Sequence, residues 1–211
     1  MTKSVRQVPR SHAGINLGET DPVAHELVEE KLFGFWIFLM SDAILFAILF
    51  ATYVTMTPNT ASGPTGAQLF DLRSVFVQTL LLLFSSFTMG MAAITVKYAR
   101  PLLHFYVWMA VTLALALGFL GLELRDFVAM LEAGASPGRS GYLSSFWGLV
   151  PLHGLHVVFG CLWLIVMLAQ VRAFGPAPFV KTRLLRLGLF WHFLDLVWIG
   201  IFSVVFLRAF I

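Results

Sequence analysis

The sequence predicts an all-α membrane protein whose single domain is a bundle of five transmembrane helices. Two observations lead to this class. Hydrophobic residues make up 59% of the 211 residues and charged residues only 12%, whereas about a quarter of a typical soluble domain is charged. The chain also contains five apolar runs, each long enough to cross a bilayer as a helix, which takes about 20 residues. Both observations predict a multi-pass membrane protein.

The tail before the first run is polar and precedes the membrane domain. Residues 1–30 contain Pro9, Gly14, Gly18 and Pro22 among charges of both signs. They lack an apolar stretch near the start, so we expect a flexible cytoplasmic tail and not a secretory signal. Residues 31–211 are expected to form the transmembrane domain, with helices at about 32–56, 75–96, 102–124, 142–171 and 187–207.

Proline, glycine and charged residues mark the connections between the five runs. Pro58 lies in the loop after the first helix, and Pro101 separates the second helix from the third. The polar stretch Arg125–Gly141 follows the third helix, and the basic stretch Arg172–Arg186 follows the fourth. Such residues favour turns over helix, which is why we end the helices there. The fourth helix also contains Pro151, where we expect a bend.

The distribution of Lys and Arg predicts the orientation, because cytoplasmic loops carry an excess of these residues. Most of the 14 lie in the tail, the second loop and the fourth loop. The opposite side carries only Arg73, Arg125, Arg139 and Arg208. We therefore expect a cytoplasmic N-terminus and a periplasmic C-terminus, in the inner membrane of a bacterium.

Asp42 is an ionisable residue inside the first run, FGFWIFLMSDAILFAILFATYV. It lies about 14 Å below the membrane surface, at 1.5 Å per residue. Its neighbours on the same helix face are apolar and include Leu39 and Phe46. We expect this carboxyl group to face protein or a cavity and to be neutral or hydrogen-bonded to the last helix. A packing group, a proton relay and a lipid site remain open as its role.

The last helix carries His192 and Asp195 on one face, at a depth similar to that of Asp42. Two carboxyl groups and an imidazole at one level predict a shared hydrogen-bonded cluster, because unpaired polar groups are costly in the membrane. Such a cluster either fixes the packing of the helices or conducts protons.

The fourth helix carries His153 and His156 on one face, with Gly160 one turn beyond. Two such histidines can form half of a metal site, but the chain offers no Glu-x-x-His motif to complete it. We therefore expect no metal, haem or catalytic residue in this chain. Glu123, near the outer end of the third helix, is instead expected to pair with His153.

The second helix carries Gln78, Ser85 and Ala92 at seven-residue spacing. Small residues let helices approach closely, so this face predicts a helix–helix seam. The sequence shows no phosphate-binding glycine loop and no Ser-His-Asp set. Its basic residues flank the apolar runs instead of forming a patch, so we expect no nucleic-acid partner.

Four segments together resemble the signatures of subunit III of the haem-copper terminal oxidases. They are FLMSDAILFAILFATYV, GFLGLELRDF, RSGYLSSFWGLVPLHGLHVVFG and FWHFLDLVWIGIFSVVF. The resemblance covers nearly everything from about residue 31 to the end. Its most specific parts are His-Gly-Leu-His-Val and Trp-His-Phe-x-Asp-x-Val-Trp. The chain resembles the five-helix version of this family, in particular that of the bacterial cytochrome o ubiquinol oxidases.

The resemblance implies a subunit that binds no haem and no copper. It implies a main contact with subunit I, which holds the haems, the copper and the proton channels, and further contacts with subunits II and IV. It also implies bound phospholipid and support of assembly and sustained proton uptake. Six residues match intramembrane positions that are polar in the family: Asp42, Glu123, His153, His156, His192 and Asp195. The two helices that form one wall of the lipid cleft in the longer family members have no counterpart here.

The residues leave three alternatives open. The same role in a bacterial cytochrome c oxidase differs only in the electron donor. A small proton or ion transporter would use Asp42, His192 and Asp195, although no internal repeat supports it. A haem-bearing cytochrome would place its ligands among the histidines.

Overall fold

The computed structural model describes residues 22–61, 63, 66–98 and 101–210. Five of its helices are long and apolar enough to span a membrane, as the sequence predicts. In chain order the helices are α1 (Pro22–Met56), the short α2 (Gly66–Leu69), α3 (Leu72–Lys97), α4 (Leu102–Glu132), α5 (Gly141–Phe174) and α6 (Pro178–Ile201). A π-helical segment (Phe202–Phe206) and a 3-10 segment (Leu207–Phe210) continue α6.

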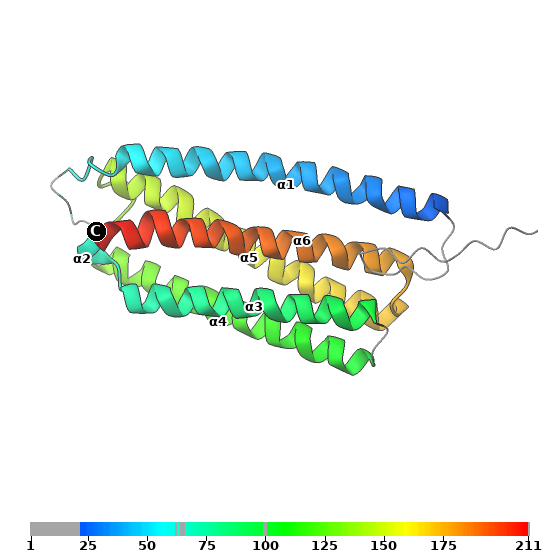
Figure 1. The fold of residues 1–211 in the computed structure, drawn as a ribbon. Coiled ribbons are helices and arrows are strands. Elements are labelled where there is room, and N and C mark those ends of the chain that lie inside the picture. The colour runs from blue at the N-terminus through cyan, green and yellow to red at the C-terminus, as the bar shows by residue number, and fades with distance from the viewer. Residues whose placement is uncertain (1–21, 62, 64–65, 99–100, 211) are drawn as a thin grey trace, which may run out of the picture.

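The long helices lie along one another in a bundle, with α1 on one side and the α3–α4 pair on the other (Figure 1). α6 contacts α1, α3 and α5, and α3 packs along α4. α1 packs on α5 and α6. However, only 11% of its apolar membrane-spanning stretch is buried inside the protein, against 28–44% in the other four helices. α1 is therefore the most exposed of the spanning helices. Its start and the C-terminal end of the chain lie at opposite ends of the bundle (Figure 1).

Two helices begin earlier than the sequence predicts. α1 begins at Pro22 and not near residue 32, and α6 begins at Pro178 and not at residue 187. Proline suits the first helical position because its missing N–H needs no partner there. Both expectations placed the helix start at the edge of the apolar run, whereas polar residues continue the helix beyond it. The rest of the expected tail, residues 1–21, lies outside the described residues.

Two helices also end later than predicted. α4 continues through Arg125 to Glu132 instead of ending near residue 124, and the turn after it contains Gly134 at φ 74°. α5 ends at Phe174, before Gly175 at φ 66°. Glycine adopts such left-handed conformations without strain, so these glycines, and not the first charged residue, mark the helix ends.

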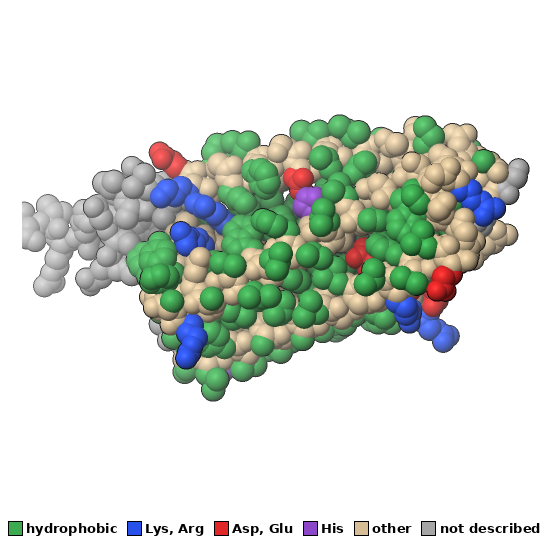
Figure 2. Space-filling model, turned by 180° about the vertical axis from the view of Figure 1, so that it is seen from behind, with side chains coloured by type: hydrophobic (Ala, Val, Ile, Leu, Met, Phe, Trp, Pro, Cys, Tyr) green, Lys and Arg blue, Asp and Glu red, His purple; other side chains and the backbone are tan. Residues whose placement is uncertain are grey.

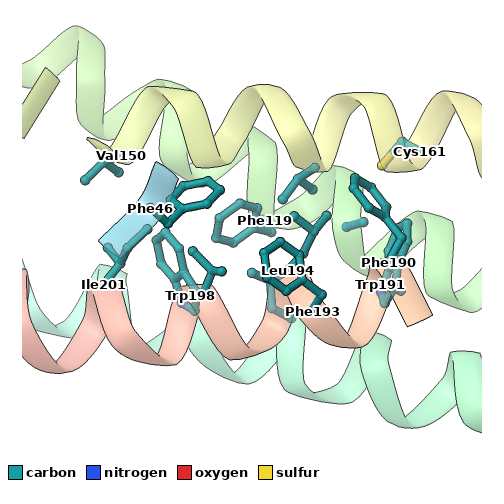
Figure 3. Close-up of a cluster of buried hydrophobic side chains, with 14 of the residues drawn as sticks. Phe46, Phe119, Val150, Cys161, Phe190, Trp191, Phe193, Leu194, Trp198 and Ile201 are labelled. Carbon is teal, nitrogen blue, oxygen red and sulfur yellow. The ribbon is translucent and has the colours of Figure 1, made fainter. Parts of the chain in front are cut away.

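Aromatic rings fill the centre of the bundle between α1, α4, α5 and α6 (Figure 3). Phe119 meets Trp198 edge to face, with ring centroids 4.6 Å apart. Trp198 is fully buried, and its Nε1–H donates a hydrogen bond to Thr79 Oγ1 at 3.1 Å. Because a buried indole N–H needs an acceptor, this bond fixes the position of α6 against α3.

Candidate functional site

The pair formed by Asp42 and His156 joins α1 to α5 inside the membrane-spanning region. Asp42 Oδ2 lies 3.4 Å from His156 Nε2, and the side chains are 14% and 22% exposed, respectively. The contact lacks hydrogen-bond geometry, so Asp42 Oδ2 has no hydrogen-bond partner within the part of the chain that the structure describes. Of the two expected states of Asp42, the hydrogen bond to the last helix is not formed, because α1 turns this face toward α5. A neutral carboxyl group stays a prediction.

A second contact of His156 fixes which ring nitrogen carries hydrogen. His156 Nδ1 lies 2.7 Å from the carbonyl oxygen of Leu152. A carbonyl oxygen only accepts, so Nδ1 donates, and in the neutral ring Nε2 is left as an acceptor facing Asp42. His156 therefore lies between its own helix and α1, with one ring nitrogen facing each.

This pair lies at a groove of about 740 Å³ between α1 and α5, with Phe190 of α6 also in its wall. The remaining lining is apolar and includes Phe38 and Phe159, which are 56% and 59% exposed. On the face shown in Figure 2, acidic and histidine side chains meet at a hollow among hydrophobic side chains. The groove therefore combines a long apolar wall with a small polar patch.

His192 and Asp195 do not join Asp42, which corrects the predicted three-residue cluster. His192 Nδ1 lies 2.7 Å from Ser86 Oγ on α3, and Asp195 lies close to both His192 and Ser86. The two residues thus lie against α3, while Asp42 contacts α5. Depth along the helices was predicted from the sequence, but the direction in which each face points was not.

The expected contact between Glu123 and His153 is also not formed. His153 is fully buried, and neither ring nitrogen has a hydrogen-bond partner among the described residues. Its ring lies among aromatic rings, with centroids 5.3 Å from that of Trp198 and 6.2 Å from that of Phe119. The Glu123 carboxyl group lies instead against Gly154, where an added Cβ would be 2.5 Å from Oε2.

A polar network that sequence reasoning missed joins α3 to α4 near the end of the bundle that holds the C-terminus. Asp126 Oδ2 accepts hydrogen bonds from Ser74 Oγ and from Gln78 Nε2, each at 2.7 Å. Arg125 donates to Asp126 Oδ1 at 3.0 Å and to Ser74 Oγ at 2.9 Å. Gln78 was predicted only as part of a seam. The four-residue spacing of Ser74 and Gln78, opposite a charged pair on the next helix, was the available signal.

The predicted seam on α3 is present. Ser85 and Ala92 are fully buried, and Ser85 Oγ accepts a hydrogen bond from Trp191 Nε1 of α6 at 3.1 Å. Over the described residues, no three His, Cys, Asp or Glu side chains converge as metal ligands would. The polar groups therefore connect helices in separate pairs and triads and do not form one centre.

Comparison with known proteins assigns this arrangement to a family. The model of the family "Cytochrome c oxidase subunit III" matches residues 18–209. The chain is 43% identical to cytochrome bo(3) ubiquinol oxidase subunit 3 of Pseudomonas aeruginosa over 92% of either chain. It is 39% identical to quinol oxidase subunit 3 of Bacillus subtilis, over 85% of this chain and 87% of the relative.

A relative named for a different donor matches about as well. Cytochrome c oxidase subunit 3 of Alkalihalophilus pseudofirmus is 41% identical, over 86% of this chain and 88% of the relative. The family match covers all five spanning helices, including both corrected helix starts. This chain therefore belongs to the cytochrome c oxidase subunit III family, the third subunits of haem-copper terminal oxidases.

Proposed function

We propose that this chain is the non-catalytic third subunit of a proton-pumping respiratory ubiquinol oxidase in a bacterial inner membrane. Ubiquinol oxidation and the reduction of oxygen to water would take place in subunit I, which would hold the haems and copper. The relatives named ubiquinol oxidase subunit 3 support this donor. Cytochrome c is the second candidate donor, favoured by the relative named cytochrome c oxidase subunit 3.

The donor is tested on the purified complex that contains this chain. Oxygen uptake is measured with a ubiquinol and, separately, with reduced cytochrome c. The proposal expects uptake with ubiquinol only. Uptake with cytochrome c and none with ubiquinol would assign the chain to the other branch of the family.

Within the complex, the proposed role is to bind phospholipid, to contact subunit I with subunits II and IV nearby, and to sustain proton uptake. The groove between α1 and α5 carries this part of the proposal. Its volume of about 740 Å³ and apolar lining suit an acyl chain. The polar patch of Asp42 and His156 lies in the same wall.

A matched pair of substitutions tests lipid binding in the groove. Val166 lines the groove and is 49% exposed, whereas its neighbour Ile165 is 48% exposed and lies outside the lining. Native mass spectrometry of the intact complex should show less bound phospholipid in Val166→Trp and unchanged lipid in Ile165→Trp. Equal amounts of bound phospholipid in both variants would show that the groove is not the binding site.

The proposed orientation places the start of α1 in the cytoplasm and the C-terminus in the periplasm. It is supported by the excess of Lys and Arg at the end of the bundle where α5 ends and α6 begins. A C-terminal epitope tag should be accessible to antibody on intact spheroplasts. Accessibility only after the membrane is broken would reverse the topology.

A further inference from the structure

A second cavity, separate from the groove, lies between α3, α4, α5 and α6. Its volume is about 90 Å³. Most of its wall is apolar. Four polar residues also line it: Asp71, Gln78, Glu123 and Asp126. It lies toward the end of the bundle where α3 begins, α4 ends and α5 begins. It shares no lining residue with the groove of Asp42 and His156.

Three of the four polar residues have partners on their own side of the cavity. Asp71 accepts a hydrogen bond from the backbone N–H of Arg73 at 3.0 Å. Asp126 and Gln78 are bonded to each other, and Arg125 lies 3.0 Å from the Asp126 carboxylate. The charge of Asp126 is therefore balanced within the network at the mouth of the cavity.

Glu123 is the exception. It lies three residues before Asp126, on the same face of α4, and is only 4% exposed. Its Oε1 has no hydrogen-bond partner among the residues that the structure describes. A buried polar atom without a partner costs about 1–3 kcal/mol, and more if it is charged, so a partner inside the cavity would be strongly favoured.

The neighbouring helix limits where that partner can lie. A Cβ at Gly154 would come within 2.5 Å of Glu123 Oε2 and 3.0 Å of Oε1, so the α5 backbone already occupies one side of the carboxyl group. His153, the next residue of α5, has its ring among aromatic rings and does not line the cavity. The cavity side is left for the partner.

Water fits both the space and the chemistry. One buried water needs about 10–15 Å³ of such volume and makes about three hydrogen bonds. The cavity of about 90 Å³ therefore has room for several waters, and the carboxyl and amide groups of Glu123 and Gln78 supply polar partners.

We propose that ordered water fills this cavity, hydrogen-bonds to Glu123 and connects its carboxyl group through Gln78 and Asp126 to the aqueous phase at that end of the bundle. The charged and titratable groups around Glu123 are Asp71, Arg125 and Asp126 on the cavity side and His153 on α5. The proposed row of waters ends at Glu123, because the aromatic rings around His153 separate the cavity from the groove of Asp42 and His156. Glu123 is thus a hydrated site, reached from the side opposite the start of α1.

Radiolytic footprinting of the intact complex tests this proposal, since hydroxyl radicals formed from bound water oxidise the side chains next to it. Met130 lines the cavity and is 5% exposed, whereas Met89 is 3% exposed and lines no described cavity. Met130 should be oxidised several times faster than Met89. Equal rates in the wild-type complex would overturn the proposal.

A variant tests whether the oxidation of Met130 depends on water bound at Glu123 or on bulk solvent. In Glu123→Leu the rate at Met130 should fall toward that of Met89, and an unchanged rate would show that the reactivity does not depend on Glu123. If the variant does not assemble, a cryo-EM map of the wild-type complex decides the question. It should show water density within hydrogen-bond distance of Glu123 Oε1, and density for a lipid or a partner side chain there would refute the proposal. None of these readouts depends on the electron donor.

Discussion

Gly160 of α5 lies directly against two aromatic rings of α6, and replacing it with alanine should destabilise the bundle. An added Cβ would be 3.2 Å from Trp191 Cζ3 and 3.3 Å from Phe190 Cε1. Trp191 is 3% exposed and its Nε1–H is bonded to Ser85 Oγ, so this ring cannot give way without disturbing its own neighbours. Overpacking of this kind costs about 1–3 kcal/mol, whereas alanine gains about 1 kcal/mol over glycine in helix propensity. The expected net loss for Gly160→Ala is about 0–2 kcal/mol.

Gly148, on the same helix, is the matched control. A Cβ there would meet no atom within 4 Å, so Gly148→Ala receives the gain in helix propensity without the overpacking. The propensity term is common to both variants and cancels in their difference. That difference, about 1–3 kcal/mol, measures the close approach of α5 and α6 alone.

The free energy of unfolding is measured by titrating the full chain from mild detergent micelles into SDS, with helical circular dichroism as the readout. Gly160→Ala should unfold at lower SDS than Gly148→Ala. Equal unfolding free energies in the two variants would refute the reasoning, because they would show that the rings move aside at no cost.

Three further predictions concern single polar contacts. Asp42→Ala should leave the haem content of the complex intact but weaken retention of this subunit or sustained turnover, and loss of haem would contradict a supporting role. The hydroxyls of Thr88 and Thr112 lie 2.8 Å apart, and a double-mutant cycle to valine in the SDS assay should give a coupling of about 0.6 kcal/mol; zero coupling would show that the contact contributes nothing. Thr79→Val removes the acceptor of the buried Trp198 N–H and should cost about 1–3 kcal/mol, a loss that should shrink in a Trp198→Phe background.

The class and the number of spans could be predicted because the length of an apolar run is set by the thickness of the bilayer. The helix ends could not, because a change in polarity marks the membrane surface and not the end of the helix. α4 shows the difference: its apolar run stops before Arg125, but the next residue with a left-handed backbone is Gly134. Most residues between those two points, such as Ala129, Met130, Leu131 and Glu132, are good helix formers and continue the helix beyond Arg125.

The candidate residues were predicted, but most of their partners were not. A helix that is apolar on all sides gives no periodic signal for the face that meets another helix, because lipid and protein interior are equally apolar. Asp42 could therefore be placed in depth, while its partner on α5 rather than α6 depended on the rotation of α1. The seam through Ser85 was predicted correctly because small residues, unlike large apolar ones, distinguish a packed face from a lipid-facing one.

The position of α1 links the groove to the stability of the bundle. α1 is the least buried of the spanning helices. Among the described residues, its polar contacts with α5 include the pair of Asp42 and His156 and the hydrogen bond from Tyr53 Oη to Tyr142 Oη at 3.3 Å. Ring contacts add to them, between Phe35 and Trp163 and between Phe46 and His156, with centroids 5.8 and 5.3 Å apart. Because Asp42, His156, Phe35 and Trp163 also line the groove, a change in α1 packing alters the groove itself. Loss of lipid and loosening of α1 in Asp42→Ala should therefore occur together, whereas Val166→Trp should remove lipid and leave the α1–α5 contact in place.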